Sequence, residues 1–332
     1  MRIATYNVEW FNTLFDDDGD LVNDATWSSR WDVTKAQQIA ALGTVFRALD
    51  ADAVMIIEAP DTSRNRSTIA ALSRFADAFD LRTTDVLTGF ANETQQEIAL
   101  LYDPKLIDVR HDPQSNDDAP RFGHTYQRDL DIGAAPEAIR WSKPPLEVAL
   151  TTPDAAVRLI GVHAKSKAPH GAGNAAEATR IAIANRRKQL AQCIWLRKRV
   201  AAHLAAGDDL IVLGDFNDGP GLDEYEKLFG RSSVEIVLGE GCDHQLYDPH
   251  ARMALGSRIG AMPTTARFKR KEGPYLQALL DYIMVSPGLM KKAPVWQIWH
   301  PFDHPDCYAN PPLREALLLA SDHFPVVLDI NL

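Results

Sequence analysis

Asp209-Leu-Ile-Val-Leu-Gly-Asp-Phe-Asn-Asp-Gly-Pro-Gly221 is the stretch of sequence that decides the fold. Its apolar run from Leu210 to Leu213 is bounded by acidic and glycine residues, which predicts a buried β-strand. The Asp-Gly-Pro-Gly sequence that follows predicts a turn. Asp215 and Asn217 therefore lie where a buried strand ends, and rigid scaffolds often present reactive groups at such positions. Taken alone, the stretch is equally compatible with a loop whose Asp and Asn hydrogen-bond their own backbone.

Polar side chains recur at the ends of other predicted strands. These strands span Met1–Asn7, Ala53–Glu58, Val157–His163, Leu279–Val285 and Phe324–Ile330. The side chains concerned are Asn7, Glu58, His163, Asp281, Asp322 and His323. A buried charge costs free energy unless it is paired or bound to a metal. Repetition of that cost at so many strand ends therefore indicates a functional site.

Length and composition favour one intracellular domain. The chain has 332 residues and is 45% hydrophobic, enough to bury a large core in one unit. The absence of a linker, low-complexity tract or repeat predicts a single domain over residues 1–332. No apolar run approaches the roughly 20 residues that span a bilayer, and no secretion signal is recognisable, so a cytoplasmic location is expected. The three cysteines are odd in number and widely spaced, which argues against a disulfide framework.

The charge balance is acidic. The net charge is −10, a poor match to tight nonspecific binding of a duplex, which depends on many Lys and Arg contacts. A phosphate ester can still bind an acidic protein through a metal ion and a local basic patch. Basic residues cluster between Arg180 and Arg199 and between Arg267 and Lys271. Both clusters are expected to be largely solvated faces, and the first is expected to lie too far from the strand ends to contact a substrate.

Apolar periodicity predicts helices between the strands. The predicted helices span Thr34–Leu49, with Thr34 as N-cap, Ser67–Phe79, Ala176–Ala206 and a short Leu222–Phe229. Further strands are predicted over Glu97–Asp103 and Pro294–Trp299, with short strands and loops over residues 104–147. This mixture predicts an α/β fold with a buried sheet core.

The residue types at the strand ends favour metal-assisted phosphoester chemistry. Carboxylates and amides suit Mg²⁺, with Mn²⁺ as a substitute, because these ions prefer oxygen ligands. Such an ion neutralises phosphate oxygens and a leaving oxyanion. Asp215 is placed in sequence to act as the base that deprotonates water. His163 and His323 could donate hydrogen bonds to phosphoryl oxygens, whereas a lone histidine at a strand end is more often structural.

Several segments of the sequence resemble motifs of the endonuclease/exonuclease/phosphatase superfamily. That superfamily includes DNase I-like nucleases, inositol polyphosphate phosphatases and neutral sphingomyelinases. The matching segments, in family order, are Thr5–Val8, Ile57-Glu58, Val162–Lys167, Gly214–Asn217, Leu280–Ile283 and Ser321–His323. The resemblance implies a four-layer α/β sandwich in which two packed mixed β-sheets are flanked by helices.

The resemblance also implies a metal-binding side of the site. It assigns Glu58 as the principal metal ligand, with Asn7 beside it. Asp322 matches a second carboxylate that is either on the metal side or orients a histidine. Glu9 occupies a position that is acidic in some members of the superfamily.

The resemblance likewise implies a catalytic side. Asp215 matches the residue that handles the nucleophilic water, and Asn217 one that contacts the phosphate. His163 and His323 match the two histidines that bind phosphate and stabilise the transition state, and Asp281 matches the acid that orients one of them.

Loop sequences around the site resemble bacterial extracellular-type nucleases most. Lys165, Lys167 and Lys143, the last at a position usually held by Arg in those nucleases, are the expected substrate-binding residues. Ile57 replaces a Gln common in nucleases, and Thr94–Gln96 stands where some repair enzymes carry an aromatic residue. The latter departure weakens the case for abasic-site repair.

These observations predict a Mg²⁺-dependent phosphodiester hydrolase, with nuclease as the first expectation and nucleic acid as the partner. A phosphatase or phosphodiesterase acting on a small or lipid phosphate ester is the alternative, and the acidic charge gives it weight. A binding protein with an inactive site is disfavoured, because every expected acid and histidine is present.

Overall fold

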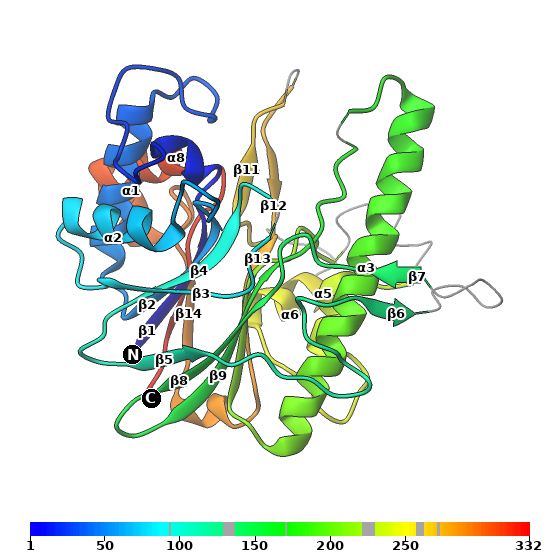
Figure 1. The fold of residues 1–332 in the computed structure, drawn as a ribbon. Helices are drawn as coiled ribbons and strands as arrows, with labels where there is room; N and C mark the ends of the chain where they lie inside the picture. Colours follow the sequence, from blue (N-terminus) through cyan, green and yellow to red (C-terminus); the bar gives the residue numbers. More distant parts are fainter. Residues whose placement is uncertain (93, 129–136, 170, 221–229, 257–261, 271–272) are drawn as a thin grey trace.

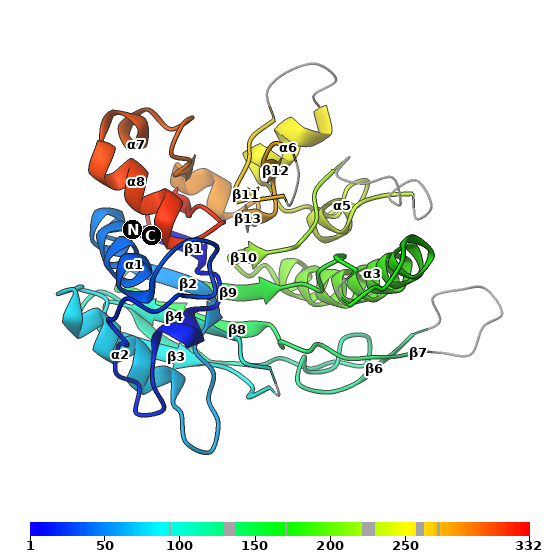
Figure 2. The ribbon, with the colours of Figure 1, turned by 90° about the horizontal axis from the view of Figure 1, so that it is seen from above.

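Two mixed β-sheets packed face to face form the centre of the computed structural model (Figure 1). The structure describes residues 1–332 except 93, 129–136, 170, 221–229, 257–261 and 271–272. Figure 2 shows the two sheets as inner layers, with helices on both outer sides. The α/β sandwich expected from the sequence is therefore confirmed.

The first sheet has the strand order β14-β15-β1-β2-β4-β3. Its strands are β1 (Arg2–Asn7), β2 (Ala53–Ala59), β3 (Asp85–Thr88), β4 (Glu97–Tyr102), β14 (Val295–Ile298) and β15 (Val326–Asp329). Strands β1 and β2 are parallel, and the other pairs are antiparallel. The chain thus begins and ends on neighbouring strands in the middle of one sheet.

The second sheet has the order β13-β10-β9-β8-β5. Its strands are β5 (Asp108–His111), β8 (Leu146–Thr151), β9 (Ala156–His163), β10 (Leu210–Asp215) and β13 (Asp281–Val285). Only β9 and β10 pair in parallel among these described strands. Two short hairpins lie outside both sheets: β6 (Tyr126–Arg128) with β7 (Glu137–Ile139), and β11 (Ala266–Phe268) with β12 (Leu276–Ala278).

The two sheets are joined by an apolar layer. Met55 and Leu100 of the first sheet pack in one cluster with Leu159 and Leu213 of the second. Because both faces of the central strands are covered, their sequences are nearly continuous apolar runs. This explains why strands β2 and β10 could be recognised from sequence.

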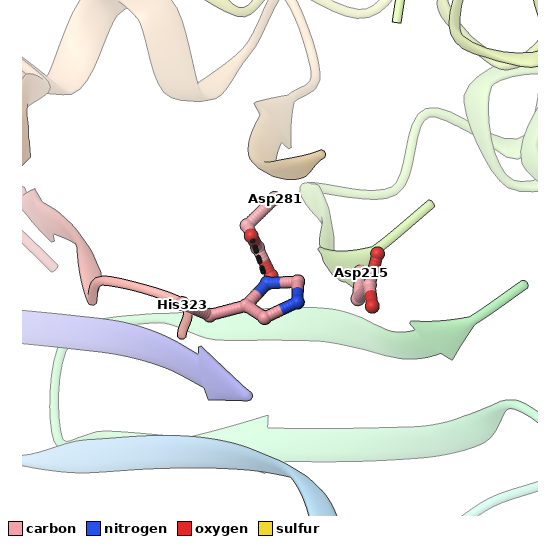
Figure 3. A group of neighbouring side chains, drawn as sticks. All are labelled: Asp215, Asp281 and His323. Atoms are coloured by element: carbon pink, nitrogen blue, oxygen red, sulfur yellow. Dashed lines mark hydrogen bonds and ion pairs between the residues drawn. The ribbon is translucent and has the colours of Figure 1, made fainter. Parts of the chain in front are cut away.

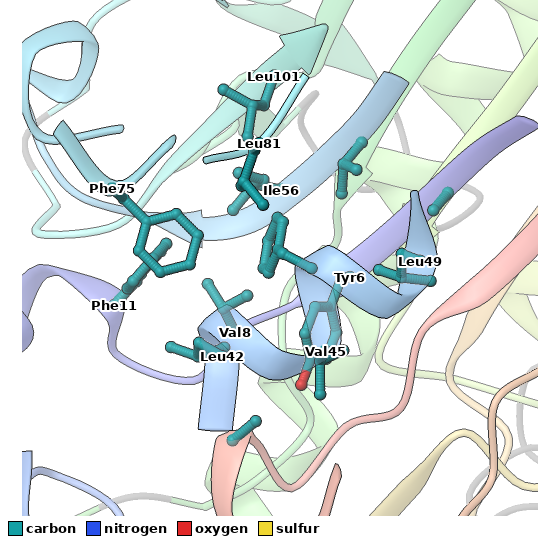
Figure 4. Packing of buried hydrophobic residues seen from close by; sticks show 14 of the residues in the cluster. Tyr6, Val8, Phe11, Leu42, Val45, Leu49, Ile56, Phe75, Leu81 and Leu101 are labelled. Carbon is teal, nitrogen blue, oxygen red and sulfur yellow. The ribbon is translucent and has the colours of Figure 1, made fainter. Parts of the chain in front are cut away.

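Helices cover the outer faces. The first sheet carries α1 (Lys35–Leu49), α2 (Thr68–Ala78), α7 (Pro305–Ala309) and α8 (Pro311–Ala320), and the second carries α3 (Ala175–Ala206), α5 (Ser233–Leu238) and α6 (Pro249–Gly256). Short 3₁₀ turns span Phe11–Leu14 and Leu289–Lys292. Figure 4 shows Tyr6 of β1 among Val45 of α1, Phe75 of α2 and Phe11.

The helix ends follow the chemistry of their sequences. The Thr34 side chain accepts a hydrogen bond from the backbone N–H of Gln37, and the Gln37 side chain accepts one in return, a complete capping box. Helix α3 ends at Gly207, whose φ of 80° is left-handed. The predicted boundaries of α1, α2 and α3 agree within about two residues with the observed ones, whereas the helix predicted over Leu222–Phe229 lies outside the described residues.

Strand direction brings the polar strand ends together. Because β1 and β2 are parallel, and β9 and β10 are parallel, each pair ends at one edge of its sheet. Strand β13 runs antiparallel to β10 and therefore begins where β10 ends. The fold thus gathers residues far apart in sequence at one edge. Within the described part of the chain, no helix has both the length and the apolar character needed to cross a membrane.

Candidate active site

Strand register places the central catalytic candidates side by side. Asp215, the last residue of β10, is directly opposite His163 of β9 and Asp281 of β13. His323 approaches from the segment before β15, and Figure 3 shows its imidazole between the two carboxylates. One ligand atom from each of Asp215, Asp281 and His323 lies within 4.8 Å of the others. The three side chains are buried.

Asp215 is held by amide donors. The side-chain amides of Asn7 and Asn217 donate to Asp215 Oδ2 at 3.0 and 3.2 Å, and the backbone N–H of Asn217 donates to Oδ1 at 2.7 Å. Burial, followed by the nearby Asp281, raises the pKa of the Asp215 carboxyl to about 7. A carboxylate whose pKa lies near neutral pH is well matched to accept a proton from water.

His323 is paired with Asp281. Its Nδ1 lies 2.7 Å from Asp281 Oδ2. Burial alone would lower the pKa of the His323 imidazole, but the carboxylates of Asp281, Asp215 and Asp322 outweigh burial and raise that pKa well above its usual value. These carboxylates therefore favour the imidazolium form, which donates from both ring nitrogens. Since a metal ligand must be deprotonated, this cluster suits hydrogen bonding to an anion better than metal binding.

His163 has the opposite electrostatic character. Burial, the Lys143 ammonium, His323 and Lys165 lower the pKa of the His163 imidazole well below its usual value. Its Nε2 lies 3.7 Å from Asp215 Oδ2 and 4.0 Å from Glu58 Oε1. Its buried Nδ1 has no hydrogen-bond partner among the described residues. The surroundings therefore favour the neutral form of His163 and the charged form of His323.

Glu58 presents one free carboxylate oxygen to the site. Its Oε2 accepts hydrogen bonds from the backbone N–H of Trp10 at 2.9 Å and from Gln96 Nε2 at 2.6 Å. Glu58 has a left-handed φ of 65°, and the pairing of β2 with β4 is irregular around it. A non-glycine residue in this conformation is strained, and such strain clusters at functional sites.

Two further carboxylates lie on the Glu58 side. Glu9 Oε2 accepts the backbone N–H of Asp322 at 2.9 Å and is also paired with Arg30. Burial and the neighbouring Glu9, with a further contribution from Glu58, raise the pKa of the Asp322 carboxyl to about 7. These carboxylates therefore repel one another, with Arg30 as a partial compensation.

This oxygen-rich group fits a divalent cation. Glu58 Oε1 accepts no hydrogen bond from any described residue. Among the described residues, Asn7 Oδ1 accepts only the backbone N–H of Glu9, at 3.1 Å. The donors of Glu58, Asp322 and Asn7 are all oxygens, which Mg²⁺ and Mn²⁺ prefer. A cation would also relieve the carboxylate repulsion.

The loop after β10 depends on glycine. Gly214 has a φ of 134°, and a Cβ there would lie 2.1 Å from the Val162 carbonyl oxygen of β9. Asn217 is also left-handed, with a φ of 50°. Gly214 thus allows β10 to approach β9 closely enough to set Asp215 beside His163.

The predicted substrate-binding lysines differ in their surroundings. Lys143 is half-buried, and burial lowers the pKa of its ammonium although Glu58 and Asp215 act in the opposite direction. Lys165 is half-buried, and burial and the nearby Lys188 lower its pKa. Lys167 Nζ is 2.6 Å from Asp218 Oδ1. Lys143 and Lys165 therefore border the site, whereas Lys167 is engaged in an ion pair.

Buried polar residues support the loops; sequence patterns did not reveal Gln189, whereas Ser321 belongs to the Ser321–His323 segment of the resemblance. Gln189 Nε2 of α3 donates to the carbonyl oxygens of Lys165, Phe216 and Asn217 at 2.9, 3.2 and 3.0 Å. Ser321 Oγ donates to the Asn7 carbonyl at 2.7 Å and accepts the backbone N–H of His323. No periodicity or motif marks Gln189 or Gln96, since each acts on a segment remote in sequence.

The chain is similar to a known protein family and to several solved structures. The model of the family described as "Endonuclease/Exonuclease/phosphatase family" matches residues 4–323. No curated protein matches the chain. Among solved structures, an AP endonuclease from Archaeoglobus fulgidus is similar over 100% of both chains, with 13% identity and a TM-score of 0.53. Truncated TDP2 from Caenorhabditis elegans is similar over 100% of this chain and 97% of its own, with 12% identity and a TM-score of 0.51.

A third solved structure contains nucleic acid. The 3′ phosphatase NExo from Neisseria, bound to a product DNA hairpin, is similar over 100% of both chains, with 15% identity and a TM-score of 0.50. At these identities the likenesses establish the shared fold.

Proposed function

The chain belongs to the endonuclease/exonuclease/phosphatase family, and from that premise we propose that it is a Mg²⁺-dependent nuclease. It is a phosphodiesterase by family, and the proposal adds nucleic acid as the substrate. The reaction is attack of water on a backbone phosphodiester.

Asp215 carries this proposal. Its carboxylate is fixed by three amide hydrogen bonds, and its pKa of about 7 lets it accept a proton at neutral pH. In the proposed reaction Asp215 orients the attacking water and takes its proton. The Asn217 side-chain amide, which also donates to Asp215, lies next to where the phosphate binds.

The two histidines and Asp281 serve the phosphoryl group. The charged His323, oriented by Asp281 through the 2.7 Å contact, donates to an oxygen that gains negative charge as water attacks. His163, at the end of β9, binds the phosphate as a neutral donor, and the Lys143 ammonium adds a positive charge beside His163.

Glu58, Asp322 and Asn7 would hold the metal ion. When bound there, Mg²⁺ neutralises phosphate oxygens and stabilises the leaving oxyanion. Gln96 and the backbone of Trp10 keep Glu58 Oε1 directed at that position by occupying Oε2.

Nucleic acid is favoured as substrate by basic residues beside the site and by the similar structures. Lys143 and Lys165 border the reacting groups, where they can contact a phosphodiester chain. One similar structure is an AP endonuclease and another holds a DNA product. The net charge of −10 favours the second candidate, hydrolysis of a small or lipid phosphate ester.

A substrate panel tests the proposal. Wild type and Asp215→Asn are assayed with Mg²⁺, and again in EDTA, on single- and double-stranded DNA, RNA, bis-p-nitrophenyl phosphate and inositol phosphates. We expect metal-dependent cleavage of nucleic acid that Asp215→Asn loses. If the wild type hydrolyses inositol phosphates and cleaves neither DNA nor RNA, the proposed nuclease function would be wrong and hydrolysis of a small phosphate ester would take its place.

A further inference from the structure

A groove beside the site is lined by basic residues that no role above uses. It has a volume of about 890 Å³, and its lining includes Phe90, His124, Arg140, Trp141 and Lys188. This volume lies within the range of about 300–1,000 Å³ that is usual for ligand sites. We call it the α3 groove, because Lys188 belongs to that helix. Figures 1 and 2 both show α3 running beside β7.

The α3 groove adjoins the segment that carries Lys143, at the border of the active site. Ser142 and Pro144, which flank Lys143 in sequence, also line it. Lys143 in turn lies close enough to Glu58 and Asp215 for their carboxylates to interact electrostatically with its ammonium. A chain whose phosphate occupies the active site can therefore extend past Lys143 into the groove.

A second hollow extends the groove along α3. It has a volume of about 570 Å³ and shares Arg140 and Lys188 with the first. The pair of hollows thus forms an extended track, which suits a linear polymer better than a compact ester.

The track is basic in an acidic protein. The described residues that line the two hollows include no Asp or Glu, although the whole chain has a net charge of −10. Arg140 and Lys188 are exposed, and no carboxylate of the described residues is within ion-pair distance of Lys165 or Lys188. Lys188 also lies close enough to Lys165 for the two ammonium groups to repel each other. An anion bound between them would relieve that repulsion.

The groove offers aromatic as well as cationic groups. Phe90 is half-buried and meets His111 edge-on, with ring centroids 4.9 Å apart, which fixes its ring. Arg140 Nε donates to Thr125 Oγ1 at 2.8 Å, which leaves its terminal nitrogens for another acceptor. Basic side chains that follow a backbone, together with aromatic rings for the bases, are typical of nucleic-acid grooves.

We propose that the α3 groove binds the nucleic-acid strand next to the scissile phosphate, with Arg140 and Lys188 contacting backbone phosphates. This inference rests on the proposed nuclease function and adds the path of the substrate. It also assigns a substrate contact to Lys188, one residue of the basic cluster of α3 that the sequence led us to expect too far from the strand ends; Lys188 is a neighbour of Lys165.

The test compares two lysines of the same helix. Lys188→Ala removes a cation of the groove, whereas Lys198→Ala removes one that pairs with Asp118 at 3.3 Å and lies outside it. For each variant, KM and kcat are measured on a labelled oligonucleotide over a range of KCl concentrations, and on bis-p-nitrophenyl phosphate. Arg140→Ala serves as a second groove variant.

Lys188→Ala and Arg140→Ala should each raise KM for the oligonucleotide and reduce the log–log salt slope by about 1. Their hydrolysis of bis-p-nitrophenyl phosphate should match wild type, as should Lys198→Ala on both substrates. If wild type cuts the oligonucleotide and the salt slope is unchanged in both groove variants, the proposed role of the α3 groove would be wrong, whereas the proposed nuclease function would stand. Hydrolysis of the small diester without any cutting of nucleic acid by wild type would overturn both.

Discussion

Replacing Asp218 by alanine should remove the partner of a buried charge beneath the active site. Asp218 accepts Lys167 Nζ at 2.6 Å and the backbone N–H of Ser233 at 2.7 Å, and it pairs with the guanidinium of Arg186. The Arg186 and Asp218 side chains are 0% and 1% exposed, so water cannot replace the lost carboxylate. The pair ties α3 to the loop that follows Asp215.

The expected cost follows from this burial. Breaking a buried ion pair by removing one partner costs about 3–5 kcal/mol, because an uncompensated charge stays in the interior. The other nitrogens of Arg186, Nε and Nη2, have no hydrogen-bond partner among the described residues. Only the bond from Nη1 to Gln189 Oε1, at 2.8 Å, would remain. We therefore expect Asp218→Ala to lose free energy of unfolding within that range.

Equilibrium urea unfolding of wild type and variants measures the loss. The matched control is Asp118→Ala, which removes the acid of an ion pair with Lys198 in which the side chains are 87% and 34% exposed. Exposed pairs contribute about 0–1 kcal/mol, so this control should unfold close to wild type.

A double variant decides the cause. Asp218→Ala combined with Arg186→Met removes both charges and leaves an apolar side chain, an exchange that is often neutral in stability. We expect it to recover most of the loss. A loss below about 1 kcal/mol in Asp218→Ala, or a double variant no more stable than the single one, would refute the reasoning.

Three further outcomes are expected. His163→Ala and His323→Ala should each lower kcat by roughly 10²-fold or more, because in the proposed reaction each removes a donor to the phosphoryl group. Poorer folding with a normal kcat would indicate that both residues have a structural role instead. Gly214→Ala should lower the free energy of unfolding by about 3 kcal/mol or more, since its Cβ would collide with a carbonyl oxygen of β9. Gly207→Ala is its control: the position is also left-handed but has nothing within 4 Å, so a cost of about 1 kcal/mol is expected, and equal costs at the two glycines would contradict the close approach of the strands. Burial raises the pKa of the Asp248 carboxyl to about 7. The contribution of this group to stability is therefore fully present below about pH 4, the pKa of an unfolded Asp, and is lost as pH rises through about 7. In urea unfolding at several pH values, the free energy of unfolding of Asp248→Asn should rise relative to that of wild type as pH rises, and a difference that stays constant with pH would exclude a raised pKa.

The strands and long helices could be predicted because their signals are local. Apolar runs marked β2 and β10, and the apolar stripe with its Thr34 cap marked α1. The polar strand ends were recognisable because burying a carboxylate or imidazole after such a run costs free energy unless the group is paired or bound to a metal. The motifs of the resemblance then placed Glu58, Asp215 and His323 in one site.

The rest of the site depends on contacts between distant segments. Gln96 supports Glu58, and Gln189 supports the loop after β10, through hydrogen bonds that no spacing in the sequence announces. The pairing of Lys167 with Asp218 and the closeness of Lys188 to Lys165 depend on how α3 lies across the second sheet. Such relations follow from tertiary packing and are invisible to periodicity.

We expect Glu58 to be the principal ligand of a catalytic divalent ion. The most direct measurement is a Mg²⁺ titration of bis-p-nitrophenyl phosphate hydrolysis by wild type and Glu58→Gln. Glu177→Gln, at a half-buried position in the first turn of α3, is the control, and urea unfolding verifies the fold. Since the amide keeps the shape but loses the charge that binds the ion, we expect Glu58→Gln to stay folded and to lose Mg²⁺-dependent turnover, with Glu177→Gln unaffected. Wild-type turnover by Glu58→Gln at saturating Mg²⁺, or undiminished wild-type activity in EDTA, would contradict the account.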